Sequence, residues 1–291
     1  MLEAAIDRIS KLPCFSKPTN VEILTGGISN LNFKVTDIGQ QFMVRLAKDV
    51  PEHGVMRWNE LELSKAAAAL NVSPEVTYHD KGILVFRYID ARTLTAREVQ
   101  DTRNLKRIVD LVAVVHNGLG AHLMTPILTF WPYQVNQVYA RKLEQAGSNY
   151  SGILPELMAA QSDLMEATGP VHLVTSHNDL LAANLLDDGS RLWLVDWEHG
   201  GYNTPLFDLA GLAGNNSLSE VHEHFLLEQY FGLSAEQHWR AYRSMKCVSF
   251  LRETLWSMTS EIYSTIDFDY AEYTRKNLEC FRNTLHDFYT S

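Results

Sequence analysis

The stretch SHNDLLAANLL at residues 176–186, followed by LVDWE at residues 194–198, decides how this sequence is interpreted. The first segment ends in apolar residues and runs into the turn signal DDGS at residues 187–190. The apolar residues that come next return as a second strand, so the sequence predicts a hairpin. Such a hairpin brings Asn184 and Asp196 to the same end.

Asp179 and Asn184 have the Asp-x-x-x-x-Asn spacing of a kinase catalytic loop. In that loop the Asp receives the proton of the acceptor hydroxyl, and the Asn helps to hold a magnesium ion, which prefers oxygen ligands. Asp179 is therefore predicted to be the general base, and Asn184 and Asp196 the magnesium ligands. The alternative is that these side chains only cap turns and strand ends. The ordered run from His177 through the hairpin to Glu198 favours phosphoryl transfer.

Composition and charge narrow the class of protein. The chain has 291 residues, with 25 Lys plus Arg and 35 Asp plus Glu, and a net charge of −10. This balance argues against a nucleic-acid-binding surface and is compatible with a cationic substrate. Three cysteines without metal-ligand spacing indicate a reducing compartment. We find neither a signal peptide nor an apolar run that could span a bilayer, so we expect a cytoplasmic protein without membrane insertion.

Residues 1–89 are predicted to form a small lobe with an antiparallel sheet and one main helix. Strand patterns fall at residues 21–24, 31–35, 41–46, 76–78 and 83–86. The helix is predicted at residues 59–70, which are rich in Glu, Leu, Lys and Ala and end before Asn71 and Pro74.

Residues 90–291 are predicted to form a larger, mainly helical lobe. Helical patterns fall at residues 95–115, 132–146, 155–167, 218–230, 235–263 and 270–289. The sequence therefore predicts an α+β fold of two lobes, in which the catalytic loop belongs to the second lobe.

Further segments accompany the catalytic loop and extend a likeness to known proteins. They are GGISNLNF at residues 26–33, DWE at 196–198, YN at 202–203, FDLA at 207–210 and LWS at 255–257. With them the chain resembles the choline and ethanolamine kinase branch of the aminoglycoside-phosphotransferase-like kinases over nearly its whole length. The resemblance implies a protein-kinase-like fold, ATP and Mg²⁺ as cofactors, and phosphorylation of the hydroxyl of a small amino alcohol. A homodimer is compatible with it.

The nucleotide is expected to lie against a glycine turn. Gly26 and Gly27 allow the backbone to approach phosphate closely, and Ser29 and Asn30 add hydrogen-bond donors. An ordinary hairpin turn is the alternative for this segment.

The resemblance also assigns a cation and a hinge to the nucleotide site. Arg45 matches the residue that contacts the nucleotide phosphates, and Glu60 on the next helix would orient it as an ion pair. The alternatives are a solvated surface pair, or Lys48 or Glu62 as the real partner. In the hinge at residues 86–89, backbone groups would meet adenine, and Phe86 and Tyr88 are the cofactor-binding candidates there. The alternative is that this segment is a plain strand end.

Two other residues near the catalytic loop are expected to support its structure. His177 matches a position that holds backbone geometry, and we do not expect it to be the base. Asp208 is expected to brace the loop by hydrogen bonds.

The acceptor site is predicted from the chemistry that recognises an ammonium group. A cation is attracted to aromatic faces and to carboxylates. The candidates are Glu198, Tyr202, Glu253 and Trp256, with Tyr263 as a further aromatic residue. The alternative for the aromatic residues is that they pack a core.

One position departs from the family pattern. Choline kinases carry a second Trp three residues before the one matched by Trp256, and here that position is Glu253. A carboxylate at this position favours a primary or protonated amine, as in ethanolamine or another amino alcohol. The alternative is that Glu253 points to solvent, and on the overall match we place choline ahead of ethanolamine.

Rival functions share parts of this pattern. Kinases of thiamine, homoserine or an aminoglycoside have the same catalytic loop and differ in the acceptor pocket. A protein of another class, a pseudokinase that binds nucleotide or a partner without turnover, is disfavoured because Asp179, Asn184 and Asp196 are all present.

Overall fold

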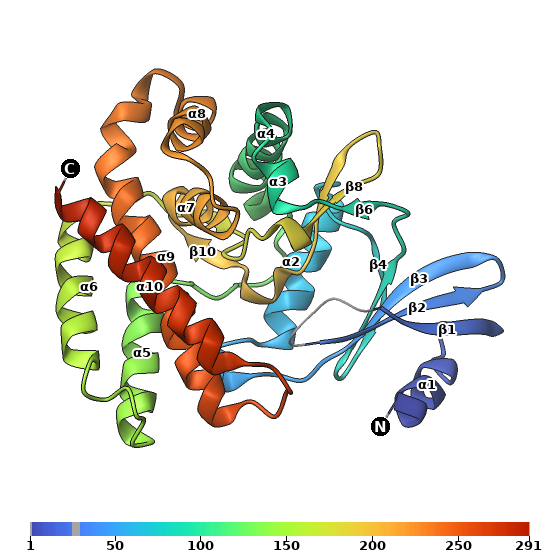
Figure 1. Ribbon diagram of the computed structural model, residues 1–291. Helices are drawn as coiled ribbons and strands as arrows, with labels where there is room; N and C mark the ends of the chain where they lie inside the picture. The colour runs from blue at the N-terminus through green and yellow to red at the C-terminus, as the bar shows by residue number, and fades with distance from the viewer. Residues whose placement is uncertain (1, 25–29, 291) are drawn as a thin grey trace.

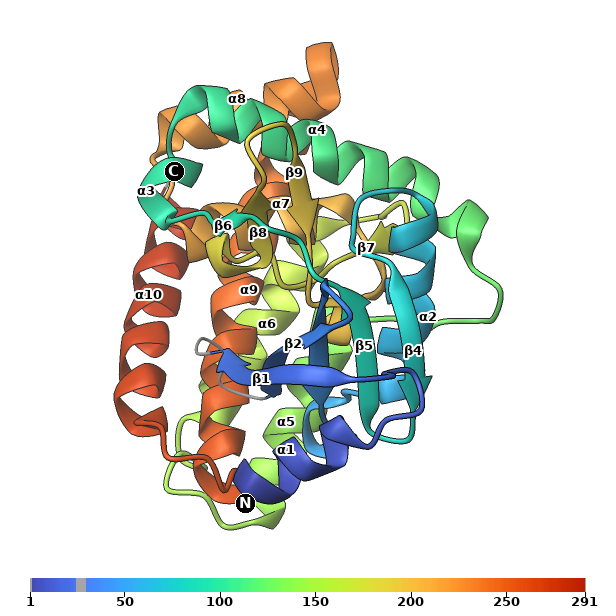
Figure 2. The same cartoon turned by 90° about the vertical axis from the view of Figure 1, so that its right-hand side faces the viewer.

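The first lobe is a five-stranded antiparallel sheet with two helices (Figures 1 and 2). The structure is a computed structural model that describes residues 2–24 and 30–290. The strands follow the order β1-β2-β3-β5-β4 in the sheet. The elements are α1 (Leu2–Ser10), β1 (Pro18–Leu24), β2 (Leu31–Asp37), β3 (Gln40–Leu46), α2 (Arg57–Ala69), β4 (Val76–Asp80) and β5 (Ile83–Arg87). Every strand expected in this part of the sequence is present.

Alternating burial explains why β2 and β3 pair as they do. Phe33 lies opposite Val44 in the register, and both are fully buried together with Val35. These side chains share a small core with residues of α1 and the segment that follows it. The hairpin turn has positive φ at Ile38 and Gly39, as a two-residue type I′ turn requires.

Helix α2 joins the two lobes. Its buried residues Leu63, Ala66 and Ala67 belong to the large core of the second lobe and not to the small core under the sheet. Asn59 adds two hydrogen bonds, because its side chain donates to the Gly200 carbonyl at 2.9 Å and accepts from the Leu128 amide at 2.9 Å. The start of α2 is therefore fixed against the second lobe.

The second lobe is mainly helical and contains two small sheets. Its helices are α3 (Ala96–Val99), α4 (Thr102–Gly118), α5 (Pro132–Gln145), α6 (Leu154–Thr168), α7 (Pro205–Asn215), α8 (Glu220–Phe231), α9 (Ala235–Tyr263) and α10 (Tyr270–Thr290). Its strands are β6 (Arg92–Thr93), β7 (Val174–Ser176), β8 (Leu185–Asp187), β9 (Leu192–Leu194) and β10 (Gly201–Asn203). Helix α9 is central, with α5, α6, α7 and α10 packed against it, and Figure 1 shows α10 lying along it.

The structure corrects one predicted helix and adds two. The helix expected at residues 95–115 is broken into α3 and α4, because Thr95 and Asp101 each accept a hydrogen bond from a backbone amide at a helix start. Helices α1 and α7 were not predicted. Among the described residues, no helix is long and apolar enough to cross a membrane.

Candidate active site

The catalytic loop follows β7, and Asp208 of α7 holds its start by hydrogen bonds. The amides of His177 and Asn178 donate to the two Asp208 oxygens at 2.8 and 2.6 Å. His116 Nε2 donates to the same carboxylate at 2.9 Å. Burial opposes the charge of Asp208, but these hydrogen bonds outweigh it and lower the pKa of the carboxyl. The expected bracing role of Asp208 is confirmed.

His177 supports the loop as expected. Its Nε2–H donates to the Val195 carbonyl at 2.9 Å, and its ring meets the edge of Trp197 with centroids 4.8 Å apart. Because the imidazole is fully buried, its pKa is lowered, since burial disfavours the charged ring. His177 thereby ties the start of the loop to the strand that leads into Asp196.

The predicted hairpin brings Asn184 and Asp196 together. Strands β8 and β9 pair with Leu185 opposite Leu194, and the Val195 amide donates to the Asn184 carbonyl at 3.0 Å. The Asn184 side-chain amide donates to the Asp179 carbonyl at 2.9 Å. Asp196 has a left-handed φ of 72°, which turns the chain as it leaves β9. Three residues separated in sequence thus meet at one end of the hairpin.

The donor atoms at this end of the hairpin fit a magnesium ion. The described residues contain no group of three or more His, Cys, Asp and Glu side chains that could hold a metal alone. An amide oxygen from Asn184 and a carboxylate from Asp196 are a small set of hard ligands. Magnesium is usually bound by one or two carboxylates together with nucleotide phosphates, and such a set suits it.

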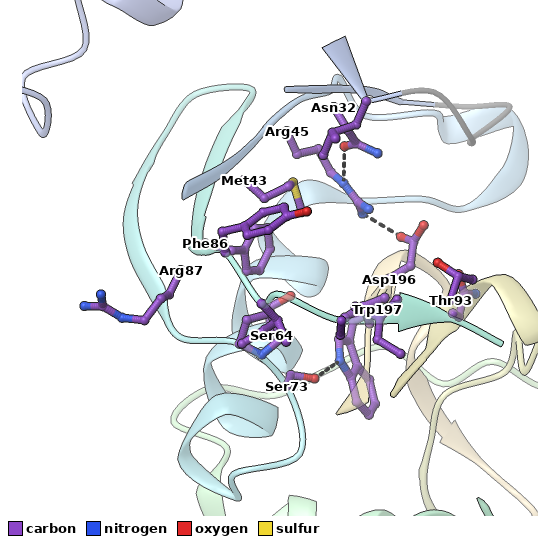
Figure 3. Close-up of a pocket in the computed structure, with 18 of the residues that line it drawn as sticks. Asn32, Met43, Arg45, Ser64, Ser73, Phe86, Arg87, Thr93, Asp196 and Trp197 are labelled. Atoms are coloured by element: carbon purple, nitrogen blue, oxygen red, sulfur yellow. Dashed lines mark hydrogen bonds and ion pairs between the residues drawn. The ribbon is translucent and has the colours of Figure 1, made fainter. Parts of the chain in front are cut away.

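A pocket of about 270 Å³ opens between the lobes beside this hairpin (Figure 3). Its walls include apolar side chains of β3 and β5, the start of the second lobe and the end of the hairpin. The predicted site residues that line it are Arg45, Glu60, Phe86, Tyr88, Asn184 and Asp196. Gly26, Gly27 and Ser29 lie outside the described residues.

Arg45 stands at the centre of the charges in this pocket. Its Nη1 is 2.6 Å from Glu60 Oε1 and 2.5 Å from Asp196 Oδ1, and its Nε donates to Asn32 at 3.2 Å. Figure 3 shows Arg45 and Asp196 pointing toward each other across the pocket. Burial opposes the charge of Arg45, but the two carboxylates raise its pKa. The expected Arg45–Glu60 pair is present and buried, and Glu62 instead accepts from the Thr125 amide at 3.0 Å.

A second arginine extends the network. Arg57 Nη1 lies 2.5 Å from Glu60 Oε2 and 3.0 Å from Glu198 Oε2, and its Nη2 donates to Asn30 at 3.1 Å. Asn30 in turn donates to Glu198 at 2.9 Å. We call Arg45, Glu60, Arg57, Glu198 and Asn30 the inter-lobe network. It connects Asn30, helix α2 and the segment after Asp196.

Asp179 lies partly buried near several charges. Burial raises its pKa to about 8; Arg252 opposes the shift, whereas Glu253, Asp196 and Glu198 add to it. The neighbouring charges come from α9 on one side and from the hairpin on the other. Asp179 is therefore the point where the nucleotide side and the α9 side of the site meet.

Aromatic rings gather on the α9 side. Trp256 packs against His53 at 5.3 Å, Tyr270 at 5.8 Å and Tyr273 at 5.9 Å between ring centroids. The Tyr273 hydroxyl donates to Glu253 at 3.2 Å. We call Trp256, Tyr270, Tyr273 and His53 the aromatic cluster.

The other predicted acceptor residues do not belong to the aromatic cluster. Glu253 is ion-paired with its neighbour Arg252. Tyr202 lies in β10 and packs against the main core of the second lobe. Tyr263 lies at the C-terminal end of α9 and is 45% exposed.

Sequence reasoning missed Arg57, Arg252, His53, Tyr270 and Tyr273. A signal existed for Arg57, which precedes Glu60 by three residues and so shares a helix face with it. Tyr270 and Tyr273 begin the helix after the one that carries Trp256, but no spacing rule places them opposite it. His53 ends a short 3-10 helix of the first lobe (Pro51–His53), and only the tertiary structure brings it to Trp256.

The two-lobed fold and the Asp179–Asn184–Asp196 site define a phosphotransferase with an alcohol group as acceptor. The chain belongs to the choline/ethanolamine kinase family, whose model matches residues 21–222. It is 26% identical over 263 residues to protein LicA of Haemophilus influenzae, covering 87% of this chain and 76% of that protein. It is 24% identical over 307 residues to ethanolamine kinase 2 of Homo sapiens, covering 94% of this chain and 78% of that one.

Solved structures show the same fold. The crystal structure of choline kinase LicA from Streptococcus pneumoniae matches with a TM-score of 0.79 at 22% identity, covering 97% of this chain and 99% of that chain. The protein is thus a nucleotide-binding kinase of a small amino alcohol with a protein-kinase-like α+β fold.

Proposed function

We propose that the protein transfers a phosphoryl group from ATP to the hydroxyl of choline, with ethanolamine as the second candidate acceptor. One observation carries this choice: Tyr273 touches both the Trp256 ring and the Glu253 carboxylate, and its hydroxyl lies within electrostatic reach of Asp179. Aromatic faces and a carboxylate beside the base are what an ammonium-bearing alcohol needs. The hydroxyl of such an acceptor would be held near Asp179.

The state of Glu253 supports choline ahead of ethanolamine. Its carboxylate is ion-paired with Arg252 and accepts a hydrogen bond from Tyr273. The negative charge of Glu253 is therefore already balanced by the Arg252 guanidinium. A primary ammonium gains most from a carboxylate that accepts its hydrogen bonds, whereas a trimethylammonium gains from aromatic faces alone. Trp256, Tyr270 and Tyr273 offer such faces. Glu198 and Tyr202 remain candidates at the edge of this site.

The remaining roles follow from the pocket. Residues 1–89 would hold the nucleotide, with adenine beside Phe86 and Tyr88 and phosphates near Arg45 and the glycine turn. Residues 90–291 would supply the base and the acceptor wall. Asn184 and Asp196 would hold Mg²⁺, which when bound neutralises charge on the phosphate oxygens. Asp179 would accept the proton of the hydroxyl as the new bond forms.

The test is Mg²⁺-dependent release of ADP from ATP with choline, ethanolamine, thiamine, homoserine and an aminoglycoside offered separately. Asp179→Asn protein serves as the blank. We expect choline and ethanolamine to be the best acceptors, with choline first. Activity only with another acceptor would refute the proposal that choline or ethanolamine is the substrate. ATP binding without turnover of any acceptor would refute the kinase assignment. Sedimentation of the same samples tests the homodimer that is compatible with the sequence.

A further inference from the structure

Asn203, from the YN segment at residues 202–203, is fully buried beside the catalytic loop. Its Nδ2 donates to Asn178 Oδ1 at 2.8 Å, and its Oδ1 accepts from the Thr204 amide at 2.8 Å. Asn178 Nδ2 in turn donates to the His199 carbonyl at 3.0 Å. The hydrogen bonds thus run in one direction from a backbone amide to a backbone carbonyl, and each asparagine is both a donor and an acceptor. We call Asn178 and Asn203 the asparagine pair.

Asn178 has a backbone conformation that needs support from its surroundings. Its φ is 67°, in the left-handed region, and it immediately precedes Asp179. Residues other than glycine are uncommon in this region, and asparagine is among those that tolerate it best. Such conformations cluster at functional sites and persist only where the surrounding structure fixes them. Asp208 holds the Asn178 amide at 2.6 Å, and the side chain is held by His199 and Asn203, so the turn before Asp179 is fixed through both its backbone and its side chain.

The asparagine pair is anchored in residues 199–203, a firmly packed segment that follows Asp196 closely. The Gly200 carbonyl accepts a hydrogen bond from helix α2 at 2.9 Å. A Cβ at Gly201 would lie 2.5 Å from the Leu128 carbonyl oxygen, which shows how tightly the chain is enclosed there. The asparagine pair therefore links the turn before the base to a rigid segment that begins just after a magnesium-ligand candidate.

We propose that Asn178 and Asn203 are positioning residues, which hold Asp179 where it can receive the proton of the acceptor hydroxyl. This proposal rests on the proposed function, because it takes Asp179 as the base. General-base catalysis requires the carboxylate within hydrogen-bond reach of the hydroxyl, and a displacement of about 1 Å can lower the rate ~10²-fold. Loss of the pair should therefore lower kcat, and it should do so through Asp179.

The experiment separates the side chain of Asn178 from its backbone conformation. Asn178→Gly keeps access to the left-handed region and removes both side-chain hydrogen bonds. Asn203→Ala leaves Asn178 in place and removes one of the two bonds. Each change is made in the wild type and in Asp179→Asn, and kcat and KM for ATP are measured by ADP release. Asn117→Ala, at an exposed position of α4, is the matched control and should behave as the wild type.

We expect kcat to fall roughly 10- to 100-fold when either change is made in the wild type, with KM for ATP within about twofold. In Asp179→Asn, the same changes should lower turnover by less than about twofold, because the base through which they act is already absent. Either variant suffices if the other does not fold.

Two results would overturn the positioning role. One is an unchanged kcat in Asn178→Gly and Asn203→Ala. The other is an equal factor of loss with and without the Asp179 carboxylate, because a merely structural role lowers turnover in both backgrounds alike.

Failure of the proposed function gives a different result, namely absent turnover of choline and ethanolamine by the wild type. The asparagine pair is then tested by amide hydrogen exchange, which does not depend on activity. Asn203→Ala should raise the exchange rate of the amides at residues 177–179 by roughly 10-fold or more. Unchanged exchange at these amides would show that the pair does not hold the loop.

Discussion

The nucleotide side and the acceptor side of this site are built on different physical principles. On the nucleotide side, Arg57 is ion-paired with Glu60 and Glu198 within the inter-lobe network, and Arg45 is ion-paired with Glu60 and with Asp196 of the hairpin end. On the acceptor side, aromatic rings from α9, α10 and a short 3-10 helix of the first lobe pack together, and Arg252 keeps two unpaired nitrogens among the described residues. The first side is a set of buried ion pairs, which suits the proposed phosphate site, and the second is a packed cluster of rings, which suits the proposed acceptor site.

Asp179, where the two sides meet, should give the largest effect. Asp179→Asn keeps the shape but removes the base, so we expect kcat to fall by ~10²–10⁴ with nucleotide affinity unchanged. The measurement is ADP release together with nucleotide titration. Asp110→Asn, on the exposed face of α4, is the control and should behave as the wild type. Undiminished turnover in Asp179→Asn would remove the base assignment.

Arg57 tests whether the nucleotide side depends on its ion pairs. Arg57→Met leaves Glu60 and Glu198 each without one partner, and breaking a buried pair in this way typically costs ~3–5 kcal/mol. We expect a lower melting temperature and a higher KM for ATP, with less change in KM for the acceptor. Arg103→Met, at a 91% exposed position, is the control. Unchanged stability and KM would show that the network is dispensable.

Trp256 tests the acceptor side alone. Trp256→Ala removes the ring that contacts His53, Tyr270 and Tyr273, so we expect KM for choline to rise by ~2- to 30-fold, the range of a cation–π contact. KM for ATP should stay constant. Tyr263→Ala, exposed on the same helix, should change neither constant. An equal rise in both KM values would mean that Trp256 supports the fold and not the acceptor.

His53 gives the smallest effect, seen in the pH dependence of stability. Burial, with Arg252 and Lys142 nearby, lowers its pKa from 6.5 to about 3. Between pH 6.5 and pH 3, His53 therefore binds a proton in the unfolded chain but not in the folded chain. The free energy of unfolding falls by ~1.4 kcal/mol for each unit by which the pH drops in this range. We expect His53→Gln to reduce this slope by one proton in urea unfolding between pH 6 and pH 4. His199, also lowered to about 3, will maintain part of the slope, and an unaltered slope would contradict the assignment.

The contrast also explains which parts of the molecule could be predicted. The hairpin from Leu185 to Asp196 could be predicted because a turn signal between two apolar runs specifies a local structure. The same holds for the strands of the first lobe, where alternation is visible within a few residues. The helix expected at residues 95–115 was wrong because two N-capping residues, Thr95 and Asp101, outweighed a continuous apolar pattern.

The sequence by itself determined the reaction class, because Asp179, Asn184 and Asp196 lie close along the chain and local hydrogen bonds bring them together. Only the tertiary structure decided the surroundings of the acceptor. His53 meets Trp256 from the other lobe, Tyr273 reaches Glu253 from the next helix, and Arg252 pairs with Glu253. Such contacts depend on how whole helices pack against each other. The spacing of residues within one segment does not determine that packing.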